Sequence, residues 1–393
     1  MVDYDKPILD ENGNPIKIAE LAAHHCIRCI KKVKALKKIG YEVHGAGNRV
    51  SWGTEVYDTY FVWQDEKQFK NVVKMLIDQG CRILTFDTEP DLQVKWIKEV
   101  VLEMNVQDRV KVVADLHDLD SIRKGIIPIP EREMFNYADG LIYVAQPIQS
   151  ITNRLHKVTM PNITLYSYCN DGLIEYDESA IIDRKGLVYE GGANPPEDTE
   201  LNRMFSYRSL YDIIKRLVGM GNETYMYCGN ITAYDTYQDT GAILFPPTEY
   251  HKMMEGMIKY KYGILIFNNE DGQKDQVNYT LSNKMHEYMM AGLPSLTCWC
   301  PESEKYVAKH GIGFVFNHID MIGNCMDFES EYLEVMSNIK IARKKLVMEN
   351  FIIKIENLYS ELLGLEKKGM PDNIKELHMF EYGEEDVNQT LKT

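Results

Sequence analysis

Residues 277–300 read VNYTLSNKMHEYMMAGLPSLTCWC, and this stretch decides the fold. Ser282 stands where its side chain could accept hydrogen bonds from the first free amides of a helix that begins one residue later. Gly292 and Pro294 end that helix after two turns. Residues 295–300 are apolar and are typical of a buried strand. The stretch therefore predicts a short helix with defined ends that leads into the core of an α/β domain.

The start of this predicted helix suits a diphosphate. The first N–H groups of a helix have no partner within it and carry the positive end of its dipole, and Lys284 adds a full charge there. Asn283 and Glu287 are four residues apart and share one face, so Glu287 could accept hydrogen bonds from two ribose hydroxyls. Spacing alone leaves two interpretations open: a nucleotide site, or a surface helix whose Glu287 and Lys284 face water.

The rest of the chain alternates strands with helices, a pattern that predicts parallel α/β domains. The first unit is a strand at 16–21, a turn of small residues, a helix over about 26–39 that Gly40 ends, and a strand at 41–44. Further strands are predicted at 81–87, 109–114, 141–145, 163–168, 186–190, 225–229, 242–245, 263–267, 295–300 and 311–316, and further helices at 66–79, 90–104, 131–137, 248–260 and 283–291.

Polar residues follow the strand predicted at 109–114, in the run Asp115-Leu116-His117-Asp118. In parallel α/β domains the carboxyl ends of the strands meet at the ligand crevice. His117 and Asp118 are therefore candidate catalytic residues, and an ordinary capping interaction is the alternative. Asp118 and Asp120 also form a D-x-D, a pattern that can hold a divalent metal but is common by chance.

Two features of the first helix need an interpretation. Cys26 and Cys29 form a C-x-x-C at its start, where the helix dipole stabilises thiolates. No second C-x-x-C follows, and Cys298 and Cys300 supply no obvious four-ligand cage, so metal binding and redox use both remain minority interpretations. The helix also carries five lysines between Lys31 and Lys38, which form either a solvated face or a contact to anionic headgroups.

Composition narrows the class of protein. The chain has 393 residues, 45% hydrophobic and 26% charged, which fits two globular domains. No apolar run is long enough to cross a membrane and the first residues do not resemble a signal peptide, so we expect a cytoplasmic protein with reduced thiols, in contact at most with the inner face of a membrane. A net charge of −15 argues against a broad grip on nucleic acid.

The string LSNKMHEYMMAGLP at 281–294 resembles the donor-site motif of retaining glycosyltransferases of the GT-B fold, of the family 4-like, group 1 type, commonly PNKxxEYMAAGxP. In that family the glutamate at the position of Glu287 holds the donor ribose, and the helix start at Ser282, Asn283 and Lys284 faces the diphosphate. The strings LKKIGYEVH, TFDTEPD and DLHD resemble the family's first domain more thinly. Many members carry another glutamate where this chain has Tyr279.

The resemblance implies two Rossmann-like domains facing each other across a cleft, with a C-terminal helix that crosses back to the N-terminal domain. It places the acceptor domain at 1–172, a linker at 173–185 and the nucleotide-sugar domain at 186–350, with the helix and acidic tail at 351–393 packing back on the first domain. The stretch 336–363 reads as one long amphipathic segment, and the charged residues 366–393 as an appendage that frays or docks.

The loop after the predicted strand 186–190 completes the expected donor site. Gly191 and Gly192 would let backbone approach a phosphate closely. In the family an arginine follows the glycines directly and a lysine comes several residues later, and this chain has neither. Arg203 or Arg208 could substitute for them, and Arg203 is the residue that we assign to the donor.

The resemblance implies transfer of a sugar from a nucleotide-diphosphate sugar to an acceptor hydroxyl of a glycan, a lipid-linked molecule or a small molecule. Retention of configuration and no metal or other cofactor are expected, since helix amides and Lys284 would stabilise the leaving diphosphate. The alternatives are a nucleotide-sugar epimerase of the same fold, a non-catalytic nucleotide-sugar-binding protein, and an enzyme that glycosylates a DNA base.

Overall fold

The computed structural model describes residues 5–88, 92–195, 205–323 and 328–391. By its internal contacts the chain divides into two units. Unit 1 comprises Met1–Asn170 together with Val347–Thr393, and unit 2 comprises Asp171–Leu346. The expected linker at 173–185 is therefore part of unit 2, and the chain re-enters unit 1 before residue 351.

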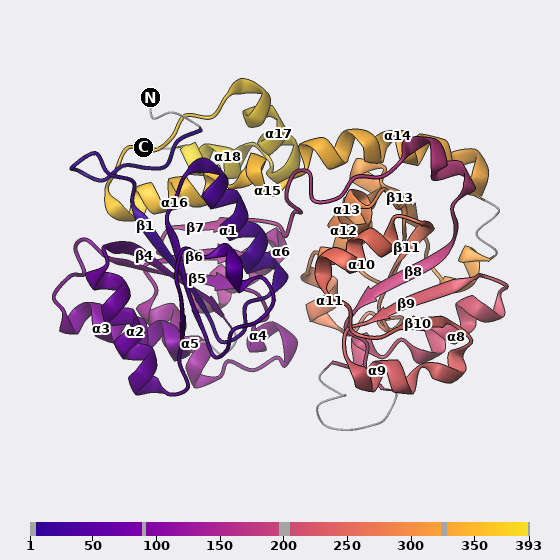
Figure 1. Ribbon diagram of the computed structural model, residues 1–393, viewed down its shortest axis with the longest axis horizontal. Coiled ribbons are helices and arrows are strands. Elements are labelled where there is room, and N and C mark those ends of the chain that lie inside the picture. Colours follow the sequence, from indigo (N-terminus) through magenta and orange to yellow (C-terminus); the bar gives the residue numbers. More distant parts are fainter. Residues whose placement is uncertain (1–4, 89–91, 196–204, 324–327, 392–393) are drawn as a thin grey trace. The chain divides into compact units, whose positions relative to one another are not determined.

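A seven-stranded sheet of parallel strands, in the order β3-β2-β1-β4-β5-β6-β7, forms the centre of unit 1 (Figure 1). The central strands are almost wholly buried, because each is covered on both faces as parallel strands require. The strands are β1 Lys17–Ala22, β2 Val43–Gly47, β3 Tyr60–Val62, β4 Cys81–Thr88, β5 Lys111–Leu116, β6 Gly140–Tyr143 and β7 Asn162–Thr164.

Alternate residues of β4 show which helices cover each face of this sheet. Thr85 lies 3.0 Å from the Tyr359 hydroxyl of the C-terminal part of the chain, whereas the Phe86 ring packs against Phe69 of α2 on the opposite face. The helices between the strands are α1 Ile27–Ile39, α2 Glu66–Asp78, α3 Leu92–Glu103, α4 Asp120–Arg123, α5 Ile129–Tyr137 and α6 Gln146–His156, with a 3-10 turn at Thr54–Val56.

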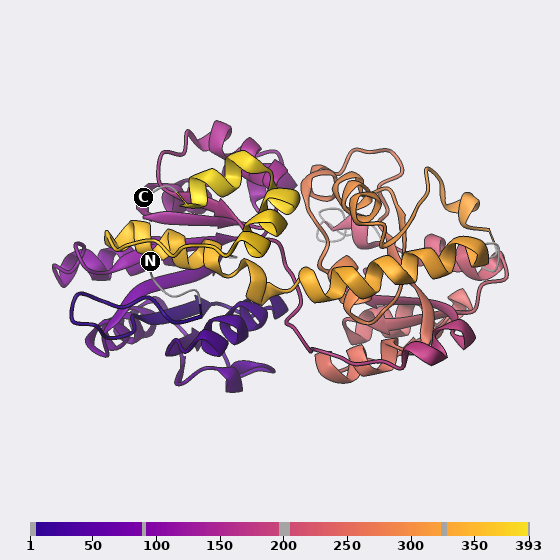
Figure 2. The ribbon, with the colours of Figure 1, turned by 90° about the horizontal axis from the view of Figure 1, so that it is seen from above.

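The C-terminal part of the chain is a structural component of unit 1. It forms α15 Met348–Phe351, α16 Ile353–Leu363, α17 Asp372–Tyr382 and α18 Glu384–Leu391, shown in yellow in Figures 1 and 2, and α16 lies against β6 and β7. The prediction of one amphipathic segment over 336–363 is wrong, because α14 ends at Lys345 and Val347 pairs with Cys169 in a β-bridge. The residues beyond 366 dock as two helices that bury His378 and Tyr382.

Unit 2 repeats the parallel pattern with a six-stranded sheet in the order β10-β9-β8-β11-β12-β13. Its strands are β8 Lys185–Gly191, β9 Thr224–Cys228, β10 Ile243–Phe245, β11 Tyr260–Ile266, β12 Ser295–Cys298 and β13 Gly313–Val315. Its helices are α8 Tyr211–Gly219, α9 Ile231–Thr236, α10 Tyr250–Met257, α11 Asp275–Tyr279, α12 Asn283–Met290, α13 Pro301–His310 and α14 Glu329–Lys345, with 3-10 turns at Glu178–Asp183, Ser206–Arg208, Gln238–Thr240 and Ile319–Ile322.

The predicted helix after Ser282 is α12, and it packs closely on β11. A Cβ atom added to Gly263 of β11 would lie 2.3 Å from the ring of Tyr288, so only glycine lets the two elements approach this closely. The Tyr288 hydroxyl donates to the carbonyl oxygen of Ile264 at 3.0 Å. These contacts fix the position of α12 against the sheet of unit 2.

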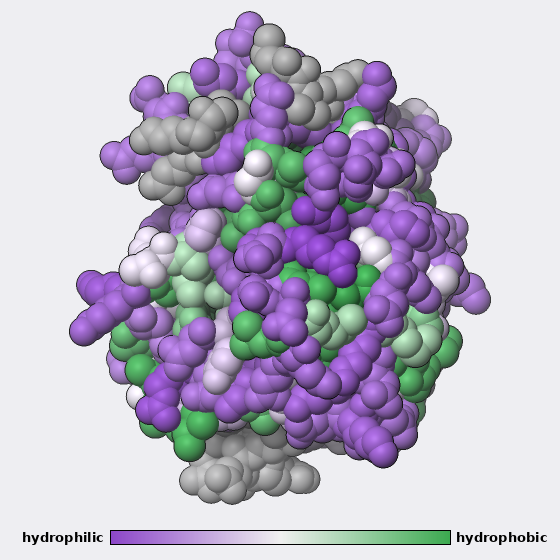
Figure 3. Space-filling view, turned by 90° about the vertical axis from the view of Figure 1, so that its left-hand side faces the viewer, coloured by the Kyte–Doolittle hydropathy of each residue, from purple (hydrophilic) through white to green (hydrophobic). Residues whose placement is uncertain are grey.

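The lysines of α1 do not form one exposed face. Lys31 is 1% exposed and Lys32 is fully buried, and Lys37 pairs with Asp58 at 2.7 Å. A face of five exposed lysines is therefore wrong, because two of the five side chains lie inside unit 1, and the membrane contact through Lys31–Lys38 stays a prediction. Hydrophilic residues cover most of the face of this unit that Figure 3 shows. No helix in the described part of the chain is long and apolar enough to cross a membrane.

Candidate functional site

The start of α12 lacks the side-chain cap that the sequence predicts. Ser282 stands at the N-cap position with an extended backbone, but its side chain accepts no hydrogen bond from the first turn. Its own backbone N–H instead donates to the Ser303 hydroxyl of α13 at 3.2 Å. The prediction that Ser282 caps the helix is wrong, and the first amides of α12 keep the electrostatic character that favours an anion.

The glycine loop after β8 lies directly against this helix start. Gly191 has a φ of +111°, a conformation that favours glycine, and its carbonyl oxygen accepts from the Gly229 N–H at 3.0 Å. A Cβ atom on Gly191 would lie 3.1 Å from Cε and 3.3 Å from Nζ of Lys284. The Gly192 carbonyl oxygen accepts from the Tyr189 hydroxyl at 2.7 Å. The structure thus brings Gly191, Gly192 and Lys284 together.

Lys284 lies among aromatic rings and acidic side chains. Its Nζ atom is 5.4 Å from the ring centre of Tyr189 and 5.3 Å from that of Phe267. Burial lowers the pKa of Lys284, and the carboxylates of Glu190 and Glu287 partly offset this effect. A dianionic group beside the ammonium would supply the counter-charge that favours its protonated form.

The remaining predicted donor residues differ in how far the structure describes them. Ser282 and Asn283 are partly exposed, whereas Glu287 is buried at 3% exposure. Arg203 lies outside the described residues. Arg208 borders the glycine loop, because its Nη1 atom would be 3.6 Å from a Cβ atom on Gly192. Glu190, which the sequence analysis did not single out, is buried at the end of β8.

In unit 1, His117 lies at the carboxyl ends of β4 and β5. Its Nδ1 atom is 3.7 Å from Cys26 Sγ, and its Nε2 atom is 3.3 Å from Oδ1 of Asp87 and 3.7 Å from Oδ1 of Asp115. Burial alone would lower the pKa of His117, but the charge of Cys26 and the contact to Asp87 outweigh it and raise the pKa well above its ordinary value. An imidazolium flanked by anions is the state that this geometry favours.

A network of buried ion pairs lies next to His117 and includes its neighbour Asp115. Lys32 Nζ lies 2.8 Å from Glu20 and 2.7 Å from Asp115, and Arg28 contacts the other oxygen of Asp115 at 3.1 Å. All four of these side chains are at most 2% exposed. The sequence analysis missed this network, although Glu20, Asp87 and Asp115 stand out as acidic residues inside otherwise apolar strands.

Asp118, the other predicted catalytic residue, is partly exposed just beyond β5. Asp120 of the D-x-D pattern pairs with Arg123 at 2.8 Å and with Lys124 at 2.9 Å. A metal would have to compete with both basic side chains for that carboxylate. The structure leaves the roles assigned to His117 and Asp118 as predictions.

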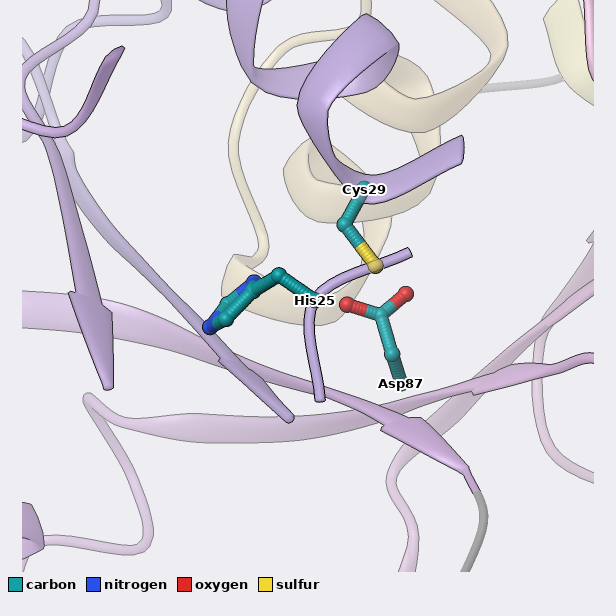
Figure 4. A group of neighbouring side chains, drawn as sticks. All are labelled: His25, Cys29 and Asp87. Atoms are coloured by element: carbon teal, nitrogen blue, oxygen red, sulfur yellow. The ribbon is translucent and has the colours of Figure 1, made fainter. Parts of the chain in front are cut away.

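Two groups of side chains in unit 1 bring potential metal ligands within 4.8 Å of one another: His25, Cys29 and Asp87, shown in Figure 4, and Asp87, Asp115 and His117. In the first group both ring nitrogens of His25 already have partners, since Nδ1 lies 2.7 Å from the Tyr57 hydroxyl and Nε2 lies 3.1 Å from the Ala46 carbonyl oxygen. In the second, Lys32 and Arg28 occupy the carboxylates. These residues are thus committed to protein contacts and do not fit a metal in this arrangement.

A cavity of about 640 Å³ lies elsewhere in unit 1, between β7 and the helices α16 and α18. Its lining includes Lys354, Lys367 and Asp386, and none of the predicted site residues. Lys354 pairs with Asp386, and Lys367 pairs with Glu361 at 3.0 Å. The cavity therefore includes neither the glycine loop nor His117.

Solved structures with a similar fold include glycosyltransferases. A glycosyltransferase from Rickettsia africae ESF-5 matches 89% of this chain and 99% of its own at a TM-score of 0.59 and 9% identity. An alpha-glucosyltransferase in complex with UDP and a 13-mer DNA containing an HMU base matches 95% and 100% at 0.55 and 13%. AviGT4, a glycosyltransferase involved in avilamycin A biosynthesis, matches 89% and 98% at 0.52 and 10%.

The fold is GT-B. No protein-family model and no curated protein sequence matches the chain. The GT-B fold accounts for both parallel sheets, since the likeness extends over most of the chain and nearly all of each of these structures. At these identities it shows the fold alone, so the chemistry must be argued from the residues of this chain.

Proposed function

We propose that this GT-B protein transfers a sugar from a nucleotide-diphosphate sugar to an acceptor hydroxyl. The observation that carries the proposal is the position of Lys284, which lies against Gly191 at the start of α12. A diphosphate there would meet a lysine, the uncapped amides of a helix and a glycine loop that backbone can approach closely. We propose that Glu287, one turn further along α12, accepts hydrogen bonds from the ribose hydroxyls of the donor.

The same groups would serve the reaction as well as binding. Negative charge builds on the leaving diphosphate as the glycosidic bond breaks, so positive groups fixed at that place stabilise the transition state more than the ground state. Lys284 and the helix amides supply this charge without a metal. Retention of configuration is part of the proposal through the resemblance of residues 281–294 to the retaining enzymes.

In unit 1 we assign contacts with the transferred sugar or the acceptor to His117 and Asp118. His117 is held as an imidazolium, since its two ring nitrogens face Cys26 and Asp87, and a sugar hydroxyl would have to displace one of these partners to accept a hydrogen bond from it. Asp118 directly follows it and is partly exposed. Both residues would act on the transferred sugar or the acceptor, so binding of a nucleoside diphosphate without the sugar should not depend on them.

The proposal is tested by thermal shift with a panel of nucleotide sugars and by product analysis. A ligand at about 100 times its dissociation constant stabilises the folded state by about 2.7 kcal/mol. Glu287→Ala should abolish that shift and keep the fold, whereas Glu255→Ala on α10, where the carboxylate is exposed, should leave the shift unchanged. An unchanged shift in Glu287→Ala would contradict the assignment of the donor ribose.

Tyr279 favours a second candidate, a non-catalytic nucleotide-sugar-binding protein. It stands at the end of α11, at a position where many retaining glycosyltransferases of the GT-B fold carry a second glutamate. Transfer to an acceptor panel separates the two, and the panel should include glycans, lipid-linked acceptors and DNA with an HMU base, because one structure of this fold binds such DNA. An isomer of the nucleotide sugar that forms without any acceptor would instead indicate an epimerase.

A further inference from the structure

The start of α1 brings two cysteines into contact beside His117. Cys26 is the N-cap residue of this 13-residue helix and is partly exposed, and Cys29 is buried one turn further along. Their Sγ atoms are 3.4 Å apart, and Cys26 Sγ lies 3.7 Å from Nδ1 of His117. Asp87 fixes the far side of the imidazole at 3.3 Å from Nε2. The Cys26 thiol, the His117 imidazole and the Asp87 carboxylate thus lie next to one another in that order.

The surroundings of Cys26 stabilise its thiolate. The hydrogen bond from Cys29 has the largest effect and, with the charge of His117, holds the pKa of Cys26 well below its ordinary value of 9.0. Burial raises the pKa of Cys29 well above the same value. A nucleophilic sulfur beside a protonated partner thiol is the arrangement of dithiols that exchange disulfides.

The other described cysteines have a different environment. Burial raises the pKa of Cys81 and of Cys298 to about 12 and that of Cys228 to about 11. Cys169 and Cys300 are also buried. Among the cysteines that the structure describes, Cys26 therefore combines exposure with a lowered pKa.

We propose that Cys26 and Cys29 form a redox-active dithiol that reacts with low-molecular-weight disulfides. The proposal does not depend on the glycosyltransferase function, because it requires only the thiol chemistry of α1.

The reaction proceeds in two exchanges. The Cys26 thiolate attacks one sulfur of the small disulfide, the S–S bond of the disulfide breaks, and one small thiolate leaves and takes up a proton from solvent. Cys29 then loses its proton and attacks the Cys26 sulfur of the mixed disulfide, which releases the second small thiolate. The dithiol is oxidised by two electrons and the small disulfide is reduced to two thiols.

Formation of the Cys26–Cys29 disulfide requires only a small movement of the two sulfur atoms. The sulfurs must move from 3.4 Å to about 2.05 Å, the length of a disulfide bond. Oxidation removes the negative charge that faces Nδ1 of His117, while Asp87 and Asp115 still face Nε2 and Lys32 lies behind both carboxylates. The pKa of His117 should therefore fall on oxidation, and NMR titration of its ring protons measures this shift.

The test exposes the full chain to oxidised glutathione, quenches with acid and maps the peptides by mass spectrometry. Wild type should form the Cys26–Cys29 disulfide, Cys29→Ser should stop at a glutathione mixed disulfide on Cys26, and Cys26→Ser should form neither. Cys81→Ser, which removes a buried thiol elsewhere in unit 1, should behave as wild type.

Two results would overturn the proposal. One is glutathione spread evenly over the cysteines of the native chain, and the other is a Cys29→Ser protein without a mixed disulfide on Cys26. Should a variant fail to fold, the wild-type peptide map and the His117 titration decide alone: an unoxidised Cys26 at equilibrium with oxidised glutathione, or a His117 pKa unchanged by oxidation, contradicts the inference.

Discussion

At the scale of single residues, Gly191 is where backbone conformation and the proposed chemistry coincide. Its φ of +111° disfavours any other residue, and a Cβ atom would press on Lys284. The residue thus sets both the path of the loop and the place of the ammonium group. Neither constraint could be deduced from a Gly-Gly pair in the sequence, because both arise from the neighbouring helix.

We expect Gly191→Ala to lower the free energy of unfolding by about 1–2 kcal/mol, the cost of forcing an ordinary residue into this region. Nucleotide-sugar binding should weaken as well, because the added methyl group displaces Lys284. Chemical denaturation and thermal shift measure the two effects. Gly219→Ala in α8, where a Cβ atom meets nothing within 4 Å, is the control and should leave binding unchanged.

Cys26 should also be recognisable by its pH dependence. An ordinary thiol loses about tenfold in thiolate for each unit that the pH falls below its pKa, whereas the lowered pKa of Cys26 leaves it a larger thiolate fraction at the same pH. Iodoacetamide at pH 6 should therefore alkylate Cys26 in preference to the other cysteines that the structure describes. Equal labelling of Cys26 and Cys81 under these conditions would contradict the lowered pKa.

At the scale of elements, strands and helices were predictable where hydrophobic periodicity and glycine or proline ends agreed. The sequence located α12 to within a residue and most of the parallel strands to within a few. Two predictions were wrong for one shared reason: that the Ser282 side chain caps α12, and that the lysines of α1 are all exposed. Both depend on partners that are distant in sequence: Ser303 for the amide of Ser282, and Asp115 for Lys32.

The network around Lys32 predicts a large effect from one substitution. Asp115→Asn removes the carboxylate shared by Lys32 and Arg28 and leaves buried positive charge, so we expect a loss of about 3–5 kcal/mol in the free energy of unfolding. Glu66→Gln, which breaks an exposed pair with Lys70, should cost less than about 1 kcal/mol. Urea denaturation at pH 7 compares the two variants with wild type.

The same network gives a sign for the pH dependence. Burial raises the pKa of Asp115, but Arg28 and Lys32 outweigh it and hold the pKa below its ordinary value of 3.8. Since this pKa is depressed in the folded state, the stabilisation is complete above about pH 3.8 and is lost as the pH falls through the folded value. The difference between wild type and Asp115→Asn should therefore shrink in acid. A difference that stays constant from pH 7 to pH 3 would contradict the ion pairing.

At the scale of the whole molecule, the chain returns to unit 1 after unit 2 is complete. The resemblance to GT-B enzymes predicted such a return, but the sequence did not reveal where the long helical stretch breaks. The break at Leu346 depends on the pairing of Val347 with Cys169, a contact between segments far apart in the chain. Patterns within one segment carry no information on such a contact.

Removal of residues 347–393 should unfold unit 1 and leave unit 2 folded. The deleted part buries several large side chains within unit 1, among them Phe351, Ile353, Leu358 and Tyr359. Calorimetry of the chain ending at Leu346 should show one transition fewer than wild type. A chain ending at Gly383, which lacks only α18, should keep both transitions. Two intact transitions in the shorter chain would refute this structural role.

The proposed donor site depends on the capture of a diphosphate by Lys284 beside Gly191. Isothermal titration calorimetry of uridine and guanosine diphosphates onto the full chain tests it most directly, with Lys284→Met as the variant and Lys305→Met, an exposed lysine on α13, as the control. We predict that Lys284→Met weakens binding at least about tenfold, or about 1.4 kcal/mol, and that Lys305→Met binds as wild type. Equal affinity of wild type and Lys284→Met for both nucleotides would contradict the proposed donor site.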